Sequence, residues 1–212
     1  GRLSQPEGGA LPLRIKLIYA LGDHTVNLGL SAMLFLFPLF LTDTALLRPA
    51  LAGLVPLVAR WIDAFADPAM GRLSDATRWR SGRRRPYFLI GAIPLGVSFA
   101  LLWTTTDSES QTAKFAYYAG IYIVFALSTT VLSVPYLALI PEMATSYQER
   151  TSVNVFRGAG AILGTLLAVS LMKPLTTLFG GGAGGYAAAG VLLGLWLVLP
   201  WPFVYRVSFE RP

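Results

Sequence analysis

The chain has 212 residues, of which 54% are hydrophobic and 13% are charged. A soluble domain carries about 25% charged residues, so this composition excludes an ordinary soluble protein. The lack of cysteine excludes a disulfide framework, and the single histidine, His24, argues against a zinc site. The net charge of +6 does not indicate nucleic acid, because the basic residues lie at the ends of apolar segments.

Six apolar segments are long enough to cross a membrane as helices. We predict spans at about 13–41, 46–73, 87–105, 115–140, 152–171 and 186–205. Residues 1–12 are a polar tail before this 13–206 bundle, and residues 207–212 begin a loop after it. The spans divide into two triplets of inverted topology, as in the halves of many secondary transporters. The predicted fold class is an all-α membrane protein with one six-helix bundle and a 3+3 inverted repeat.

Loop charges orient the spans. With the N-terminus in the cytoplasm, twelve Lys and Arg residues lie inside and three lie outside, namely Arg48, Lys114 and Lys173. We therefore expect both termini in the cytoplasm and a multi-pass protein of the bacterial cytoplasmic membrane.

The first span contains Asp23 and His24. These two residues can form a proton relay. The interpretation we favour places them near the cytoplasmic end of the span, solvated or paired with a loop arginine.

The second span carries Arg60, Asp63 and Asp67 in an otherwise apolar stretch. Spacings of three and four residues place them on one helix face. Ionisable groups inside a membrane are costly, and two carboxylates on one face can bind a cation or share a proton. The alternative is a structural ion pair with Arg60, and both interpretations can hold.

Three stretches of sequence resemble a known family. They are residues 59–71, residues 71–75 with 82–86, and residues 134–142 with 149–154 and Arg157. The chain resembles the N-terminal half of a major facilitator superfamily transporter, and more closely the glycoside–pentoside–hexuronide:cation symporters. That broad group contains the melibiose permease and the sodium-dependent lysophospholipid symporters. The resemblance implies twelve spans in all, so we expect a second six-helix half in the same chain, a homodimer mate or another subunit.

The resemblance assigns the coupling cation to Asp63 and Asp67, with Thr130 of the fourth span as a further ligand. The family has an asparagine where this chain has Ala66, and its loss removes one hard oxygen ligand. The sequence therefore favours H⁺, or a Na⁺ site completed by Thr130 or water. Only with Na⁺ are Asp63 and Asp67 metal ligands, and no other cofactor is expected. As an alternative, the Thr130 hydroxyl bonds its own helix backbone.

The resemblance places the substrate near Asn27, Ser133 and Arg157. Asn27 and Ser133 replace two sugar-binding aspartates of the family, and Leu137 replaces its stacking tryptophan, which argues against a melibiose-like sugar. Asn27 can instead join helices, and Arg157 can instead pair with an aspartate across the bundle.

The loop after the second span resembles the gating motif of the superfamily. Gly71, Asp75, Arg83 and Arg84 are then expected to latch one state of alternating access. The alternative for the arginines is orientation in the membrane together with contact to anionic lipid.

The function predicted from the sequence is cation-coupled symport of a small solute, such as a sugar or glycoside, by alternating access. One alternative is a lysolipid or amphiphile carrier. Another is a non-transporting half-transporter subunit that serves as a scaffold or assembly factor in a membrane complex. An enzyme is not expected, because no nucleophile–base pair or metal site stands out. The expected partners are a small-molecule substrate, membrane lipids and the second half, but not nucleic acid.

Overall fold

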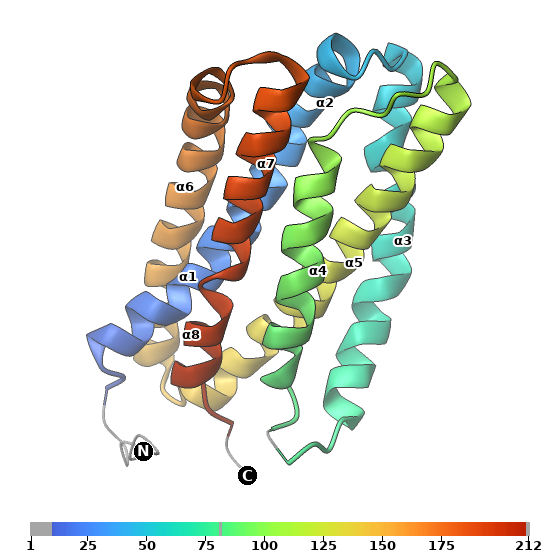
Figure 1. Ribbon diagram of the computed structural model, residues 1–212. Coiled ribbons are helices and arrows are strands. Elements are labelled where there is room, and N and C mark those ends of the chain that lie inside the picture. Colours follow the sequence, from blue (N-terminus) through green and yellow to red (C-terminus); the bar gives the residue numbers. More distant parts are fainter. Residues whose placement is uncertain (1–9, 81, 211–212) are drawn as a thin grey trace.

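The computed structural model describes residues 10–80 and 82–210 as a bundle of long helices (Figure 1). Its elements are α1 (Leu13–Ser31), the π-helical η1 (Ala32–Leu36), α2 (Phe37–Leu39), the π-helical η2 (Phe40–Thr44), α3 (Pro49–Ala76), α4 (Pro86–Leu102), α5 (Gln111–Met143), α6 (Tyr147–Leu178), α7 (Gly182–Val198) and α8 (Trp201–Val207).

Among the described residues, four helical segments are long and apolar enough to cross a membrane: α3, α5, α6, and α7 with α8. The series from α1 to η2 is a fifth candidate, bent by 42°, and α4 is a shorter apolar helix of 17 residues in the same bundle. This arrangement confirms the predicted fold class. Where the membrane begins and ends along each helix stays a prediction.

Both described ends of the chain lie at the same end of the bundle, here called the N/C face (Figure 1). The opposite end, called the distal face, carries η2 and the start of α5. Most of the expected 1–12 tail and the last two residues of the expected 207–212 loop lie outside the described residues. The assignment of the N/C face to the cytoplasm also stays a prediction.

Pro38 explains the irregular end of the first span. Proline has no N–H to donate and its ring crowds the carbonyl four residues before it, which disrupts the α-helical bonding pattern. The chain there alternates between α and π segments and bends. Phe37 and Phe40 flank the proline and are almost fully buried, with their rings 5.6 and 5.3 Å from that of Trp103. The bend is therefore anchored by aromatic packing against the end of α4.

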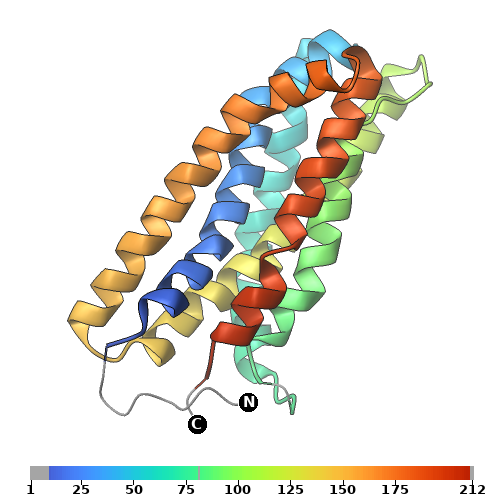
Figure 2. The ribbon, with the colours of Figure 1, turned by 60° about the vertical axis from the view of Figure 1, so that its left-hand side comes forward.

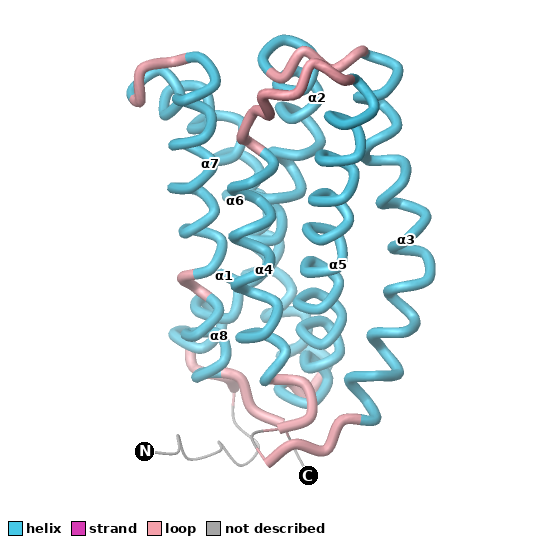
Figure 3. Tube along the Cα trace, turned by 45° about the vertical axis from the view of Figure 1, so that its right-hand side comes forward, coloured by secondary structure: helices cyan, strands magenta, loops and turns pink. Residues whose placement is uncertain are grey.

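The helices pack as pairs that run along each other. α1 lies along α6, α3 lies along α5, and α4 lies between α5 and α7 (Figures 2 and 3). α1 and α5 approach each other closely at few points, among them Gly29 beside Phe125. Asp67 of α3 accordingly contacts α5, whereas Asp23 of α1 contacts α6.

Small residues allow the close approach of α1 and α6. A Cβ added at Gly160 would lie 2.6 Å from the Ala20 carbonyl oxygen, and one added at Gly164 would overlap the His24 carbonyl oxygen. By contrast, a Cβ at Gly158 of the same helix would meet nothing within 4 Å. Helix association in membranes relies on such backbone approach at small residues.

This contrast predicts opposite effects of one substitution. Gly158→Ala should leave the melting temperature in detergent unchanged or raise it, because alanine favours a helix over glycine by about 1 kcal/mol. Gly164→Ala should lower it by several degrees, because α1 must move away from α6. Equal melting temperatures for the two variants would show that α1 and α6 do not pack through Gly164.

Candidate ion and substrate site

A hydrogen bond joins two of the residues that the sequence assigns to the ion site. The Thr130 hydroxyl on α5 donates to Asp67 Oδ1 on α3 at 2.7 Å. Its neighbours Ser128 and Thr129 instead donate to carbonyl oxygens of their own helix. Thr130, which is buried, therefore takes the cross-helix role rather than the backbone-bonded alternative.

Asp63 lies one turn from Asp67 on α3. Its Oδ1 is buried and accepts no hydrogen bond from the described residues. Among residues 10–80 and 82–210, no ion pair joins Arg60 to Asp63 or Asp67. A buried carboxylate oxygen without a donor is costly, and a cation or a proton would satisfy it. The geometry thus holds two carboxylates and one hydroxyl on facing helices.

This group of ligands suits a monovalent cation or a proton better than a transition metal. No cluster of three His, Asp or Glu side chains with metal-binding geometry occurs among residues 10–80 and 82–210. Carboxylate and hydroxyl oxygens are hard ligands, which Na⁺ shares with Ca²⁺ and Mg²⁺. The residues therefore fit Na⁺ incompletely, with water or a further oxygen needed to complete the shell.

Arg157 is engaged within the chain. Its Nε lies 2.7 Å from Asp23 Oδ2, and both side chains are largely buried. Arg157 Nη1 also donates to Asn154 Oδ1 at 2.7 Å, and the guanidinium lies 5.2 Å from the ring centre of Tyr136. Asp23 thus pairs with an arginine of α6 rather than with a loop arginine, because α1 and α6 pack along their length.

Two tyrosines join α1 and α5 where these helices cross. The Tyr19 hydroxyl donates to the Tyr136 carbonyl at 2.5 Å, and the Tyr136 hydroxyl donates to the Tyr19 carbonyl at 2.6 Å. Their rings stack with centres 4.3 Å apart. Gly22 makes room for this stack, since a Cβ there would lie 2.6 Å from a ring carbon of Tyr136. Sequence reasoning missed this pair, because neither tyrosine belongs to a recognisable motif.

Asn27 and Ser133, the other predicted substrate residues, differ in whether their polar groups already have a hydrogen-bond partner. The Asn27 amide donates to the Asp23 carbonyl at 2.9 Å, within its own helix. Ser133 is half-buried and makes no hydrogen bond with the described residues. Leu137, seven residues after Thr130 and so on the same face of α5, is 49% exposed. His24 accepts a hydrogen bond from the Trp196 indole at 3.0 Å rather than bonding Asp23.

The predicted gating residues form a network at the N/C face. Arg84 lies 2.5 Å from Asp75 and 2.5 Å from Glu142, and Arg83 lies 2.6 Å from Glu142. Glu142 was part of the recognised motif but carried no predicted role. Gly71 stands apart, because a Cβ there would make only an ordinary contact, 3.9 Å from Val134. Its gating role receives no support from close packing.

Glu210 is a further member of this network. Its carboxylate accepts the backbone N–H groups of Arg83, Arg84 and Arg85 at 2.7, 2.7 and 3.0 Å, just before α4. Burial of the carboxyl would raise the pKa of Glu210, but these N–H donors outweigh it and hold that pKa below its usual value. Gly82, with φ of +120°, lets the backbone turn around the carboxylate. No sequence signal pairs residue 210 with this loop.

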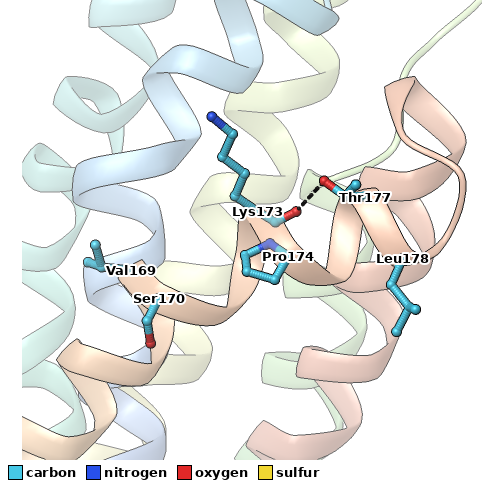
Figure 4. Close-up of a pocket in the computed structure, with 6 residues that line it drawn as sticks. All are labelled: Val169, Ser170, Lys173, Pro174, Thr177 and Leu178. Atoms are coloured by element: carbon cyan, nitrogen blue, oxygen red, sulfur yellow. Dashed lines mark hydrogen bonds between the residues drawn. The ribbon is translucent and has the colours of Figure 1, made fainter.

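A shallow hollow of about 680 Å³ lies elsewhere, on the distal half of α6 (Figure 4). It is lined by Val169, Ser170, Lys173, Pro174, Thr177 and Leu178. All six residues belong to one helix and none is a carboxylate. The hollow is therefore separate from the residues that can bind a cation.

Comparison with known proteins agrees with this geometry. Residues 18–207 match the family described as MFS/sugar transport protein. The inner membrane symporter YicJ of Escherichia coli strain K12 is 34% identical over 207 residues, covering 95% of this chain and 44% of that protein. The isoprimeverose transporter of Lactiplantibacillus pentosus is 29% identical, covering 95% and 42%. The sodium-dependent lysophosphatidylcholine symporter 1-A of Danio rerio is 31% identical, covering 76% and 30%.

The chain belongs to the MFS/sugar transport family, and it is an integral membrane protein of a family of transporters rather than enzymes. It spans less than half the length of these relatives, between 30% and 44%. The resemblance stated from the sequence motifs is thereby confirmed.

The Asp23–Arg157 pair predicts a non-additive effect of two substitutions. Asp23→Ala leaves a buried guanidinium without its carboxylate and should cost about 3 kcal/mol of stability, visible as a lower melting temperature in detergent. Adding Arg157→Met should restore part of the loss, because no unpaired charge then remains. A double variant as unstable as the sum of the single variants would contradict a direct interaction.

Glu210 predicts a pH-dependent difference in stability. Because its folded pKa is lowered, its contribution is full above the reference value of 4.5 and is lost as pH falls through the folded pKa. Glu210→Gln should therefore cost about 1 kcal/mol at pH 7, since the carboxylate is partly exposed, and progressively less below pH 4.5. Thermal unfolding from pH 3 to 8 measures this, with the exposed Glu109→Gln as control. A pH-independent difference would exclude a charge-based cap.

Proposed function

We propose that this six-helix bundle is the N-terminal half of a cation-coupled symporter, with the N/C face in the cytoplasm of a bacterium. The observation that carries the proposal is the pair Asp63 and Asp67, one of them bonded to Thr130 and the other with a buried, unsatisfied oxygen. The relatives named as symporters support it. The second half, in the same chain or another, would complete the substrate path.

The charges of α3 favour one monovalent ion. Arg60 offsets one of the two carboxylates, so the group Arg60, Asp63 and Asp67 carries a net charge of −1 when all three are ionised. One Na⁺ or H⁺ brings that sum to zero and removes the repulsion between the carboxylates. Occupancy therefore changes the relative stability of conformations that expose or bury α3, which is how an ion biases a two-state transition.

A sugar or glycoside is the first candidate substrate. Ser133 has no described hydrogen-bond partner and lies one turn from Thr130, so it can bond a substrate hydroxyl beside the ion. Arg157 is already neutralised by Asp23, so a neutral solute fits better than an anion. Arg157 can still donate to a sugar oxygen through the guanidinium atoms that Asp23 does not occupy.

An amphiphile is the second candidate, and Leu137 is the observation that favours it. This leucine is 49% exposed on the helix face that holds Thr130. An apolar side chain at that point suits an acyl chain, and one relative is named a lysophosphatidylcholine symporter.

Uptake by reconstituted vesicles separates these candidates and tests the ion site. The gene product would be given isoprimeverose or lysophosphatidylcholine under separate Na⁺ and H⁺ gradients. Asp63→Asn and Asp67→Asn should abolish gradient-driven uptake, because a neutral amide does not replace a charged ligand. Uptake that ignores both gradients, or normal coupling in both variants, would refute the proposal.

Thr130 provides a graded version of the same test. If Na⁺ is the coupling ion, Thr130→Val should weaken its activation about tenfold, since the bond that is lost ends on a carboxylate and such bonds are worth about 1.5 kcal/mol. Thr129→Val is the matched control, because the Thr129 hydroxyl bonds only the Phe125 carbonyl of its own helix. Equal effects of the two substitutions would remove Thr130 from the ion site.

A further inference from the structure

Two lysines occupy equivalent positions in the two triplets of spans that make up this bundle. Lys16 is the fourth residue of α1, and Lys114 is the fourth residue of α5. Both are buried, with 8% and 9% of their surface exposed. Lysine is almost never buried unless its ammonium group is paired, so each position needs a partner. α1 begins at the N/C face and α5 begins at the distal face (Figure 1).

Lys114 holds the connection that follows the first span. Its Nζ donates to the Ala45 carbonyl at 2.7 Å. One turn earlier, the Gln111 side chain accepts the Arg48 N–H at 2.8 Å and donates to the Leu46 carbonyl at 2.9 Å. Leu46 has φ of +55°, an unfavourable conformation for leucine that surrounding contacts must maintain. The three hydrogen bonds Lys114–Ala45, Gln111–Arg48 and Gln111–Leu46 are together called the distal clamp.

Lys16 holds the beginning of the fifth span. Its Nζ lies 3.1 Å from Glu149 Oε2 and donates to the Ser152 hydroxyl at 2.9 Å. Glu149 also accepts the Leu11 N–H at 3.0 Å. The start of α1 is thereby tied to the start of α6, just after the connection that follows α5. These bonds are named the N/C clamp.

The two clamps are equivalent when the first triplet of spans is superposed in sequence order on the second, so that span one matches span four. The start of the fourth span binds the connection after the first, and the start of the first span binds the chain just after the fourth. The third and sixth spans show the same exchange. A Cβ at Gly96 of α4 would lie 2.7 Å from the Gly194 carbonyl oxygen of α7, and a Cβ at Gly194 would lie 2.7 Å from that of Gly96. The clamps are thus related by the inverted repeat and lie at opposite faces of the bundle.

We infer that Lys16 and Lys114 are matched positioning residues, each of which restrains opening at its own face of the membrane. The inference rests on the proposed transport function, in which the faces open in turn. α1 and α5 carry Asn27, Thr130 and Ser133, and they approach each other at few points, where Tyr19 meets Tyr136 and where Gly29 lies beside Phe125. Their outer ends are therefore positioned chiefly by contacts with the neighbouring spans, and a clamp at one end stabilises the closed arrangement of that face.

Cysteine labelling tests this inference without measuring transport. These 212 residues contain no cysteine, so Ser133→Cys supplies a single reporter in this half, and any cysteine of the second half would be replaced by serine. Expressed from the native gene, it would be labelled with a membrane-impermeant maleimide in right-side-out and inside-out vesicles. Lys114→Met should raise the labelling rate from the outside about fivefold and lower it from the inside. Lys16→Met should do the reverse, and the double variant should return toward the parent.

Three further variants separate positioning from simple destabilisation or loss of charge. Lys173→Met removes a positive charge from the distal end of α6 without touching either clamp. Figure 4 shows the Lys173 amino group pointing away from the Thr177 hydroxyl. This variant should change neither labelling rate. Gln111→Leu breaks the distal clamp without removing charge and should act like Lys114→Met. Lys114→Arg retains a cationic donor and should recover most of the parent behaviour.

Each outcome has a distinct meaning. If both lysine variants shift labelling in the same direction, or neither shifts it, the clamp proposal is wrong while transport stands. If Lys173→Met matches Lys114→Met, charge at the distal face explains the effect and the clamp is again wrong. If the parent reporter is labelled from one side only, with or without Na⁺ and at any pH, alternating access fails and the proposed function fails with it.

Discussion

The cost of an unpaired charge away from water governs the arrangement of this bundle. Asp23 and Arg157 pair directly across α1 and α6. Lys16 pairs with Glu149, and Lys114 binds a backbone carbonyl at a helix end, where carbonyl groups concentrate partial negative charge. By contrast, Arg60, Asp63 and Asp67 in the middle of α3 form no ion pair with the described residues and together keep a net charge of −1. The ion site is therefore recognisable because its two carboxylates form no ion pair within the described chain.

The packing of the helices keeps that charge on a distinct part of the bundle. α3 lies against α5, whereas α1 lies against α6 through glycines that admit the opposing backbone. The two pairs meet at the Tyr19–Tyr136 crossing and through α4 and α7 behind it. Thr130 on α5 is the hydrogen-bonding link between the aspartates and the face that carries Ser133. A change in the charge of Asp67 therefore reaches α5 directly and reaches α1 through α5.

The fold was predictable because its signals are local. Long apolar segments, loop charges and the spacing of Asp63 and Asp67 each depend on nearby residues. The Asp67–Thr130 bond was named only through the family resemblance, since it joins residues 63 positions apart. For the same reason, an aspartate partner was expected for Arg157 only as an alternative and without naming Asp23, and the Glu210 cap was missed. Such contacts depend on how two helices are placed lengthwise against each other, and hydrophobic periodicity does not determine that placement. The bend in the first span was also missed, although Pro38 marks it.

The replacement of the family's asparagine by Ala66 has a physical consequence for the choice of ion. A proton needs only one carboxylate with a raised affinity for it, whereas Na⁺ needs several oxygen atoms around it. Asp63 offers an oxygen that accepts no hydrogen bond. The Thr130 hydroxyl donates its proton to Asp67, so the lone pairs of the hydroxyl oxygen remain available to bind an ion. With no amide at position 66, a Na⁺ shell must take its remaining oxygens from water or from a substrate hydroxyl. In the second case the substrate completes the ion site, and coupling between ion and substrate arises from a shared ligand rather than from a distant conformational change.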